Sequence, residues 1–280
     1  MPLPTSENVV ISASGVGANK PFSAYIIVAF LADYELVSKG QCFPLYWYEK
    51  VDEEKQKQSG DMYAAEQTPK ADSYIRHDAI TDWSLAAFQK QYDPNITKED
   101  IFYYVYGILH SPEYKSRFAA DLKKMLPRIP LAGDFWAFSK AGRELAKWHL
   151  NYEEVEPFPV TEDAKGMDLD PESFYRVKKM TFGKKDGKPD KTVIAYNENL
   201  ILRDIPLAAY DYVVNGKLAL EWIMERYQVN NDKDSRIVND PNEWSTDPRY
   251  IVDLIKRIIR VSIESMRIVE KLPPLNEATK

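Results

Sequence analysis

The spacing of the apolar residues changes along this chain, and this change constrains the fold more than any other feature of the sequence. Three N-terminal segments are rich in aromatic and β-branched residues and are separated by glycine and proline. They predict strands at Val9–Ile11, Ser23–Phe30 and Cys42–Tyr48. Residues 49–72 are polar and indicate a surface loop. Beyond residue 97 the apolar residues follow a helical period instead.

Helix signals mark the middle of the chain. Thr97 and Asp100 match a capping box ahead of an apolar run. Ser111 and Pro112 suit the N-cap and first position of a second helix, which we expect to end at Pro127. A third helix has apolar residues at helical spacing, which is typical of a buried face: Phe138, Ala141, Leu145, Trp148 and Tyr152.

Strand-like residues return after residue 173. Phe174–Phe182 and Thr192–Tyr196 predict two strands, with a possible third at Leu200–Arg203. Between the first two lie two glycines, one proline and two aspartates, so residues 183–190 indicate a long hairpin turn. The sequence thus predicts a β-hairpin region after the helical middle.

The last helix has the clearest signals. Asp247 is expected to cap it, Pro248 to occupy its first position, and Lys271 to lie at its end. Its polar face is mostly basic: Asp253, Lys256, Arg257, Arg260, Glu264, Arg267 and Lys271. The order of elements predicts an α+β fold with a β-rich N-terminal part, a helical middle, a β-hairpin region and a helical C-terminal end. We expect two parts, 1–155 and 156–280, or alternatively one compact domain over 1–280.

Several classes of protein are disfavoured by the composition. The chain has no run of 18 apolar residues that would span a membrane, and its start lacks the features of a signal peptide. Cys42 is the only cysteine, so no internal disulfide can form. We therefore expect a cytoplasmic protein.

Catalytic motifs are also missing from the sequence. The segment at residues 14–17 lacks the third glycine of a dinucleotide site and the Gly-Lys-Ser/Thr sequence of a P-loop, and the three histidines are far apart. Asp163-Ala164-Lys165 is too short to identify a nuclease, and Asn239–Asn242 lacks the aromatic residue with which a base methyltransferase holds a flipped base. We expect no catalytic residue, no metal site and no cofactor in this chain.

Charge is distributed unevenly. The net charge of -6 disfavours a general nucleic-acid binder. However, Arg176–Lys191 holds seven basic and two acidic residues, whereas Asn151–Glu172 holds eight acidic residues and one basic. Such a local basic segment can steer a polyanion onto one face. The alternative is a pair of solvated loops of opposite charge.

Several strings of residues resemble one family. They are Lys20–Ser23, Gln41–Tyr46, Asp100–Tyr114, Leu126–Leu131, Asn215–Lys217, Glu221–Tyr227 and Asn239–Trp244. Together they resemble the C-terminal specificity domain of Type ISP restriction–modification enzymes. The helical part is also similar to the single-chain Type IIG enzymes. Members of the family usually have glycine where this chain has Arg236.

The resemblance implies a function. In that family one polypeptide carries a nuclease, a helicase-like ATPase, a methyltransferase and this domain. The chain is then expected to recognise a specific sequence in double-stranded DNA and to position catalytic domains supplied by the same or a partner chain. S-adenosylmethionine, magnesium and ATP would serve those other domains. The alternatives are a domain that packs on a partner methyltransferase without reading bases and, less favoured, an independent enzyme.

Base readout requires Arg, Lys, Asn or Gln side chains that a helix or ribbon delivers into the major groove. The predicted hairpin supplies a ribbon with basic flanks, two asparagines follow it, and the last helix offers cations for phosphate contacts. The expected DNA-binding residues are Arg176, Lys178, Lys179, Lys184, Lys185, Lys188, Lys191, Asn197, Asn199, Lys256 and Arg260.

Overall fold

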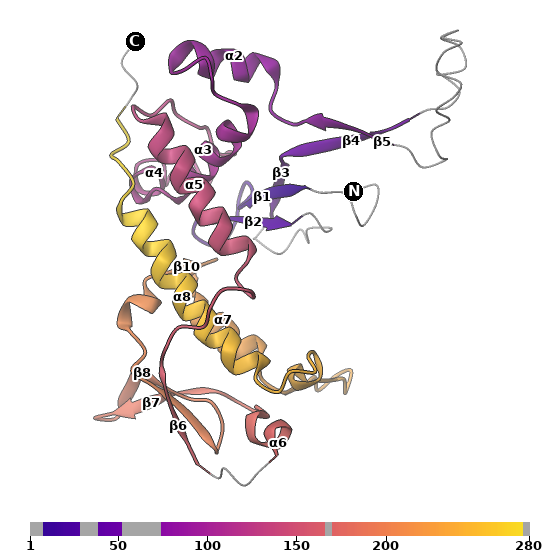
Figure 1. Ribbon diagram of the computed structural model, residues 1–280, viewed down its shortest axis with the longest axis vertical. Helices are drawn as coiled ribbons and strands as arrows, with labels where there is room; N and C mark the ends of the chain where they lie inside the picture. Colours follow the sequence, from indigo (N-terminus) through magenta and orange to yellow (C-terminus); the bar gives the residue numbers. More distant parts are fainter. Residues whose placement is uncertain (1–7, 29–38, 52–73, 166–169, 277–280) are drawn as a thin grey trace. The chain divides into compact units, whose positions relative to one another are not determined.

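The computed structural model describes residues 8–28, 39–51, 74–165 and 170–276 (Figure 1). The chain divides into two compact units. One comprises Met1–Ala146 with Leu272–Lys280, and the other comprises Lys147–Lys271. The sequence indicated a boundary at residue 155 and gave no sign that the C-terminal residues return to the first unit. Hydrogen bonds make that return: Gly133 donates to the carbonyl of Asn276 at 2.7 Å, and Arg117 donates to that of Leu275 at 3.4 Å.

The first unit contains a three-stranded antiparallel sheet in the order β2-β1-β3. Its strands are β1 (Val9–Ala13), β2 (Ala24–Val28) and β3 (Gln41–Pro44). The predicted strand Cys42–Tyr48 is instead two strands, because buried Leu45 interrupts it and donates its N–H to the carbonyl of Val9 at 2.8 Å. After this break β4 (Tyr46–Lys50) pairs with β5 (Tyr74–Asp78). Most of the predicted loop 49–72 lies outside the described residues.

In the described residues after β5, the first unit contains four helices. They are α2 (Asp82–Gln91), α3 (Lys98–His110), α4 (Pro112–Arg117) and α5 (Phe135–Leu150), whose last turn extends into the second unit. The capping box is confirmed: the Thr97 hydroxyl accepts from Asp100 N at 3.1 Å, and the Asp100 carboxylate accepts from Thr97 N at 3.0 Å. The predicted buried face of α5 is confirmed at Phe138 and Leu145, whereas Tyr152 lies beyond the end of the helix.

The connection between α3 and α4 is confirmed at Ser111, but the predicted end of α4 is wrong. The helix ends at Arg117, because Phe118 leaves helical geometry at φ -106° and ψ 17°. Its ring packs on Tyr114 at 5.2 Å between centroids. Successive single turns continue from there, such as Leu122 N to Phe118 O at 2.9 Å, before the chain reaches Pro127.

Replacing Ser111 with alanine should destabilise the first unit. The buried Ser111 hydroxyl accepts a hydrogen bond from Tyr114 N at 3.2 Å, and alanine leaves that N–H without its acceptor. We expect a loss of about 1 kcal/mol in the free energy of unfolding, measured by urea denaturation. Ser116→Ala, at an exposed position of the same helix, is the control and should cost less. Equal losses from both substitutions would contradict a capping role.

The second unit is built on a four-stranded antiparallel sheet in the order β6-β9-β8-β7 (Figure 1). The strands are β6 (Thr161–Ala164), β7 (Thr181–Lys185), β8 (Lys188–Ala195) and β9 (Leu200–Arg203). Short elements follow: the 3-10 helix η2 (Leu207–Tyr210), the pair β10 (Val213–Val214) and β11 (Lys217–Leu218), the pair β12 (Asn230–Asn231) and β13 (Val238–Asn239), and the 3-10 helix η3 (Pro241–Glu243).

The described part of this unit also contains three helices: α6 (Pro171–Tyr175), α7 (Ala219–Arg226) and α8 (Tyr250–Glu270). Leu254, Ile255 and Ile259 of α8 are fully buried in the core that contains the sheet residues Ile194 and Leu202. The α+β fold, with its β-rich N-terminal part and helical C-terminal end, is therefore confirmed. Among the described residues, no helix has the length and apolar character needed to cross a membrane.

Local predictions for the second unit were partly wrong. Phe174 belongs to α6 and not to a strand, because the Asp170 carboxylate caps that helix by accepting from Ser173 N at 3.0 Å. The predicted long turn at 183–190 is a two-residue turn, Asp186-Gly187, with φ of 52° and 76°. Aspartate and glycine tolerate the left-handed backbone that such tight hairpins require. The predicted start of the last helix is also wrong: Arg249, not Asp247, is its N-cap, and α8 begins at Tyr250, two residues after Pro248. Asp247 instead accepts from Arg249 N at 2.9 Å in the turn that precedes the helix.

Candidate nucleic-acid interface

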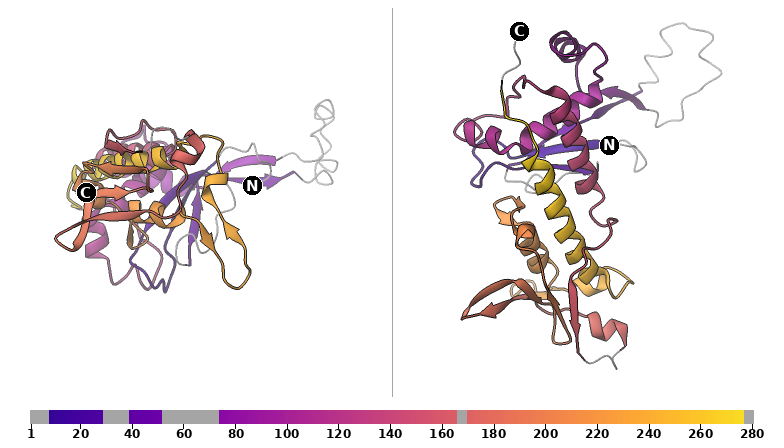
Figure 2. Two further views of the ribbon diagram at one scale, coloured as in Figure 1. Left: turned by 90° about the horizontal axis from the view of Figure 1, so that it is seen from below. Right: turned by 60° about the vertical axis from the view of Figure 1, so that its left-hand side comes forward.

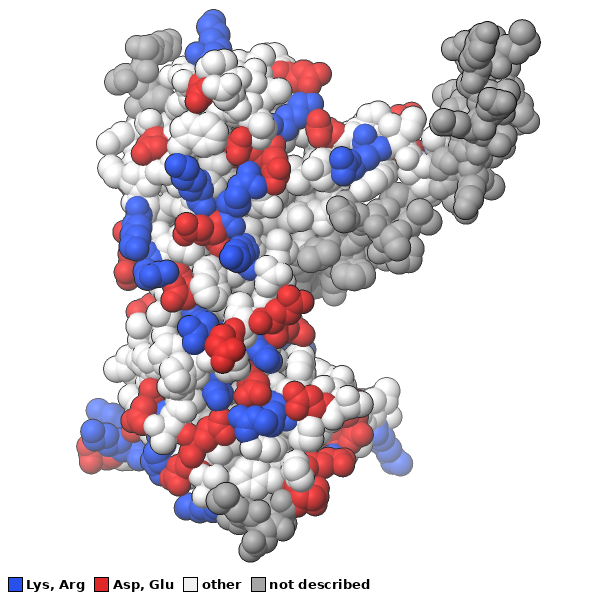
Figure 3. Space-filling view, in the orientation of Figure 1, with Lys and Arg blue, Asp and Glu red and all other residues white. Residues whose placement is uncertain are grey.

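The tip of the β7–β8 hairpin gathers three unpaired cations. Lys185 and Lys188 lie opposite each other across the Asp186-Gly187 turn, and Lys184 lies opposite Pro189. All three lysines are exposed, and within the described part of the chain none forms an ion pair. Figure 3 shows blue atoms at the lower left of this face, where Figure 1 draws β7 and β8. The tight turn therefore presents the charges to solvent.

Two other cations of the predicted basic segment are paired within the fold. Arg176 bonds to the carboxylates of Asp240 and Glu243, the latter at 3.1 Å. Lys191 lies 3.4 Å from the Glu221 carboxylate and faces the rings of Phe182 and Tyr210 at 5.6 and 5.2 Å from their centroids. These two side chains contribute to packing, so the segment offers fewer free charges than the sequence suggested.

Lys178 and Lys179 occupy a different place. Both are exposed and follow the fully buried Val177. The Lys178 carbonyl accepts a hydrogen bond from Val229 N at 3.0 Å. This bond places the two lysines at the base of the β12–β13 hairpin and not at the tip of β7–β8.

The basic face of α8 binds other parts of the second unit. Lys256, whose side chain is 14% exposed, pairs with Glu162 at 2.7 Å, and Arg249 pairs with the same carboxylate at 2.8 Å. Burial opposes the charge on Glu162, but the hydrogen bonds from Arg249 and Lys256 outweigh it and lower the pKa of the carboxyl. The α8 cations thus neutralise part of the acidic Asn151–Glu172 segment.

Arginine side chains of α8 hold the preceding chain through backbone carbonyls. Arg257 donates to the carbonyl of Val155 at 3.0 Å. Arg260 donates to the carbonyls of Glu156 and Pro157, the second at 3.2 Å. Arg260 and Lys256, both expected to contact phosphates, are therefore engaged inside the fold.

The two asparagines after β8 differ sharply. The Asn197 amide donates to the carbonyls of Phe174 and Arg176 at 2.8 and 3.1 Å and accepts from the N–H groups of Asn199 and Leu200 at 2.9 and 2.8 Å. Every donor and acceptor of this amide is occupied, so it has nothing left for a base edge. Among the described residues, none bonds to the side-chain amide of Asn199.

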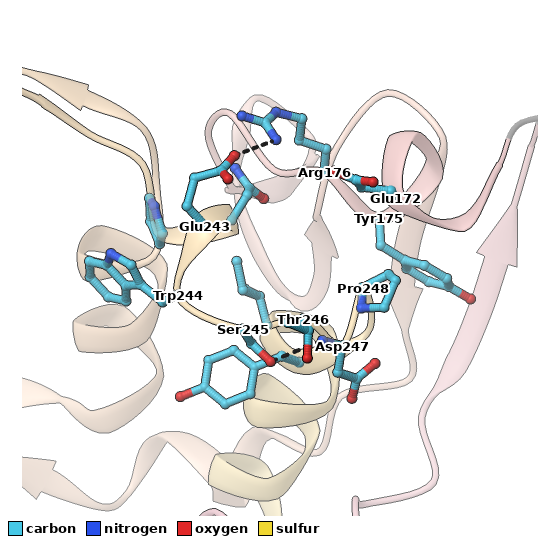
Figure 4. A pocket seen from close by; sticks show the side chains of 13 residues that line it. Glu172, Tyr175, Arg176, Glu243, Trp244, Ser245, Thr246, Asp247 and Pro248 are labelled. Carbon is cyan, nitrogen blue, oxygen red and sulfur yellow. Dashed lines mark hydrogen bonds and ion pairs between the residues drawn. The ribbon is translucent and has the colours of Figure 1, made fainter.

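A pocket of about 420 Å³ lies near the start of α8 (Figure 4). Its walls include the rings of Tyr175 and Trp244 and the carboxylates of Glu172, Glu243 and Asp247. The Arg176 guanidinium on its rim is tied to Glu243 (Figure 4). Excess negative charge repels phosphate, so this pocket does not suit a nucleic-acid backbone.

One further exposed surface, the β12–β13 hairpin, was not predicted from the sequence. All residues from 230 to 239 are exposed, including three asparagines and Arg236. Two signals were available: a polar run rich in asparagine and aspartate, and the β-branched pair Ile237-Val238 within it. The distribution of charge along the sequence did not indicate this hairpin, because it carries as many acidic as basic residues.

Within the described ranges, no group of three His, Cys, Asp or Glu residues could hold a metal ion. His77 stacks on Trp47 at 4.2 Å between ring centroids. His110 bonds to the carbonyl of Tyr106 at 2.9 Å, and His149 bonds to the Ser265 hydroxyl at 2.9 Å. Each histidine thus has a structural partner.

Comparison with solved structures gives several similar chains, among them the following three. The ATP-dependent Type ISP restriction-modification enzyme LlaBIII, bound to DNA, is 35% identical over 99% of this chain, with a TM-score of 0.81. A nuclease-deletion mutant of the Type ISP enzyme LlaGI, in complex with a DNA substrate mimic, is 34% identical over 98%, with a TM-score of 0.74. The DrdV–DNA complex is 32% identical over 98%, with a TM-score of 0.77. The chain spans only 16%, 18% and 25% of these proteins.

The family assignment rests on the sequence as well. No curated protein sequence matches the chain significantly. The model of the Type ISP C-terminal specificity domain matches residues 1–254. The similarity to Type IIG enzymes stays a prediction. With a family match over most of its length and identities above 30% to Type ISP enzymes, the chain belongs to the Type ISP C-terminal specificity domain family.

Proposed function

We propose that this chain is the DNA target-recognition module of a restriction–modification enzyme and that it binds duplex DNA with a preference for sequence. The observation that carries this proposal is the family match over residues 1–254. Two Type ISP relatives, at 35% and 34% identity, were solved with DNA or a DNA mimic. A specificity domain selects the site and leaves the chemistry to other domains.

The charges of the second unit support this proposal. Excluding Arg176–Lys191, the chain is strongly acidic, and the acidic surface repels DNA. Lys184, Lys185 and Lys188 are exposed and lie together at one hairpin tip, where DNA phosphates can approach. Attraction confined to a small surface orients the duplex as it binds.

The catalytic parts of the enzyme are proposed to lie outside this chain, because the chain spans at most a quarter of the relatives' length. In this proposal a methyltransferase, an ATPase and a nuclease belong to the same or a partner chain, and S-adenosylmethionine, ATP and magnesium bind there. By itself this chain neither methylates nor cleaves DNA.

Changing Lys184, Lys185 and Lys188 together to glutamate should weaken binding to duplexes of any sequence. Removing three phosphate contacts lowers the affinity by about tenfold to a hundredfold at physiological salt and flattens the log–log salt dependence by up to roughly 0.9 per lysine. The measurement is fluorescence anisotropy with labelled duplexes at several salt concentrations.

A charge-matched variant provides the control. Lys90, Lys140 and Lys147 are exposed on α2 and α5, and their replacement by glutamate changes the net charge equally. This variant should keep a salt dependence close to that of the parent chain. Equal affinities and slopes for the hairpin variant and the parent would remove β7–β8 from the interface. If the parent chain binds no duplex DNA, the alternative is favoured, in which the domain packs on a methyltransferase and does not read bases.

A further inference from the structure

The β12–β13 hairpin is a two-stranded ribbon whose residues are all exposed. Asn230 pairs with Asn239 and Asn231 with Val238 across the strands. The hydrogen bond from Val229 N to the Lys178 carbonyl fixes its base. In Figure 2 it is the orange-gold ribbon that extends away from α8. A ribbon this exposed contributes little to the hydrophobic core of its own unit.

The turn of this hairpin is nevertheless well ordered by hydrogen bonds. The Asp232 carboxylate accepts from Asp234 N at 3.1 Å, from Ser235 N at 2.7 Å and from the Ser235 hydroxyl at 2.8 Å. Arg236 N donates to the Asp232 carbonyl at 2.9 Å. The hydrogen bonds from Ser235 lower the pKa of Asp232, so its carboxylate stays ionised and holds the turn. A preorganised turn loses little entropy when it binds a partner.

The side chains that this ribbon presents are not used by the fold. Ile237 and Val238 are 67% and 58% exposed, although burial of such side chains is favourable. Within the described residues, the side chains of Asn230, Asn239 and Arg236 form no hydrogen bond or ion pair. Arg236 also has a left-handed backbone with φ of 60°, which favours glycine. The backbone at this position does not require a side chain, and the exposed Arg236 guanidinium is available to a partner.

We propose that the β12–β13 hairpin enters the major groove and reads base edges, an inference that rests on the proposed function. Two strands lie about 4.8 Å apart, and the major groove, about 12 Å wide, admits such a ribbon. Asparagine pairs with adenine, arginine pairs with guanine, and an aliphatic group contacts the thymine methyl. Asn230 and Asn239 share one face of the ribbon, so their amides reach neighbouring bases.

In this proposal the two hairpins have different roles: β7–β8 contacts phosphates and β12–β13 contacts bases. The β7–β8 tip displays lysines, which suit phosphates. The β12–β13 hairpin has two aspartates, one lysine and one arginine between residues 230 and 239, so it adds no net charge. Lys178 and Lys179, at its base, are positioned for the phosphates that flank the groove. Changes at β12–β13 should therefore alter sequence preference, whereas changes at β7–β8 should alter the salt dependence.

The test uses Arg236→Gly, which removes the guanidinium and suits the left-handed backbone. The full chain and the variant are each selected against a duplex library with a randomised region, and the bound DNA is sequenced. The parent should enrich one motif, and the variant should lose roughly 5-fold to 150-fold of its preference at one base position. Its salt slope and thermal midpoint should not fall. Asn230→Ala and Asn239→Ala should each relax a position as well.

The control and the outcomes separate this inference from the proposed function. Lys90→Ala removes one exposed positive charge from α2 and should enrich the parent's motif unchanged. If Arg236→Gly, Asn230→Ala and Asn239→Ala all enrich that same motif at every position, the hairpin does not read bases and the inference is overturned, while the proposed function stands. If the parent binds DNA but enriches no motif, sequence recognition itself fails and the inference fails with it.

Discussion

Replacing Gly142 with alanine should destabilise the first unit severely. A Cβ atom at Gly142 of α5 would lie 1.9 Å from the carbonyl oxygen of Tyr103 and 2.8 Å from the N of Gly107, both in α3. A Cβ atom at Gly107 would in turn lie 2.2 Å from the carbonyl oxygen of Phe138. The two helices therefore touch backbone to backbone, and neither side of the contact ends in a flexible side chain that can move away.

The expected loss in the free energy of unfolding is more than about 3 kcal/mol, because relief of the clash requires the helices to separate and leaves voids around buried rings. That is a large part of the roughly 5–15 kcal/mol that stabilises a typical domain. Thermal denaturation followed by circular dichroism measures it. Lys140→Ala, exposed on the same helix, is the control and should change stability by less than about 0.5 kcal/mol. A melting temperature near that of the parent for Gly142→Ala would show that α3 and α5 are not in direct backbone contact.

Asn197→Ala should destabilise the second unit almost as much. The substitution removes all four hydrogen bonds of the amide, which tie the turn between β8 and β9 to the end of α6. It leaves two backbone carbonyls and two backbone N–H groups without partners, next to the fully buried Tyr196 and Leu200. We expect a loss of roughly 2–4 kcal/mol in the free energy of unfolding, measured by urea denaturation.

Two variants separate this structural role from base readout. Asn197→Asp keeps the acceptors for Asn199 N and Leu200 N but loses both donors, so it should lie between the parent and Asn197→Ala in stability. Asn199→Ala, two residues away, should cost less than about 0.5 kcal/mol, because the Asn199 amide bonds to none of the described residues. An Asn197→Ala variant with parental stability but an altered DNA preference would instead restore Asn197 as a base-reading residue.

The starts of α3 and α4 were predicted correctly because their causes are local. The Thr97–Asp100 box and the Ser111 cap need only side chains within three residues of the backbone groups they bind. The Asp186-Gly187 turn also has a local signal, an aspartate followed by a glycine, although a longer turn was predicted there. The neighbouring Gly183, Pro189 and lysines made the segment resemble a longer loop, although the strands continue through them to the turn.

Helix ends and alternative elements were less predictable. The α4 helix ends at Arg117, and the following residue, Phe118, is neither the glycine nor the proline that would signal a helix end. The aromatic run at Phe174-Tyr175 resembles a strand, yet the Asp170 cap makes it the end of α6. In both places the local preference of the residues competes with packing and capping. The pattern of the sequence does not show which of these effects is stronger.

What the sequence alone determined about this protein is its α+β character, its capped helices, its family and the segment in which positive charge is concentrated. Only the tertiary structure decided which cations remain available. Lys256 meets Glu162 and Arg260 meets the Glu156 and Pro157 carbonyls from far along the chain, whereas Lys184, Lys185 and Lys188 remain exposed. The physical reason is that charge is additive along a sequence, but its neutralisation depends on distances in space that only the fold creates.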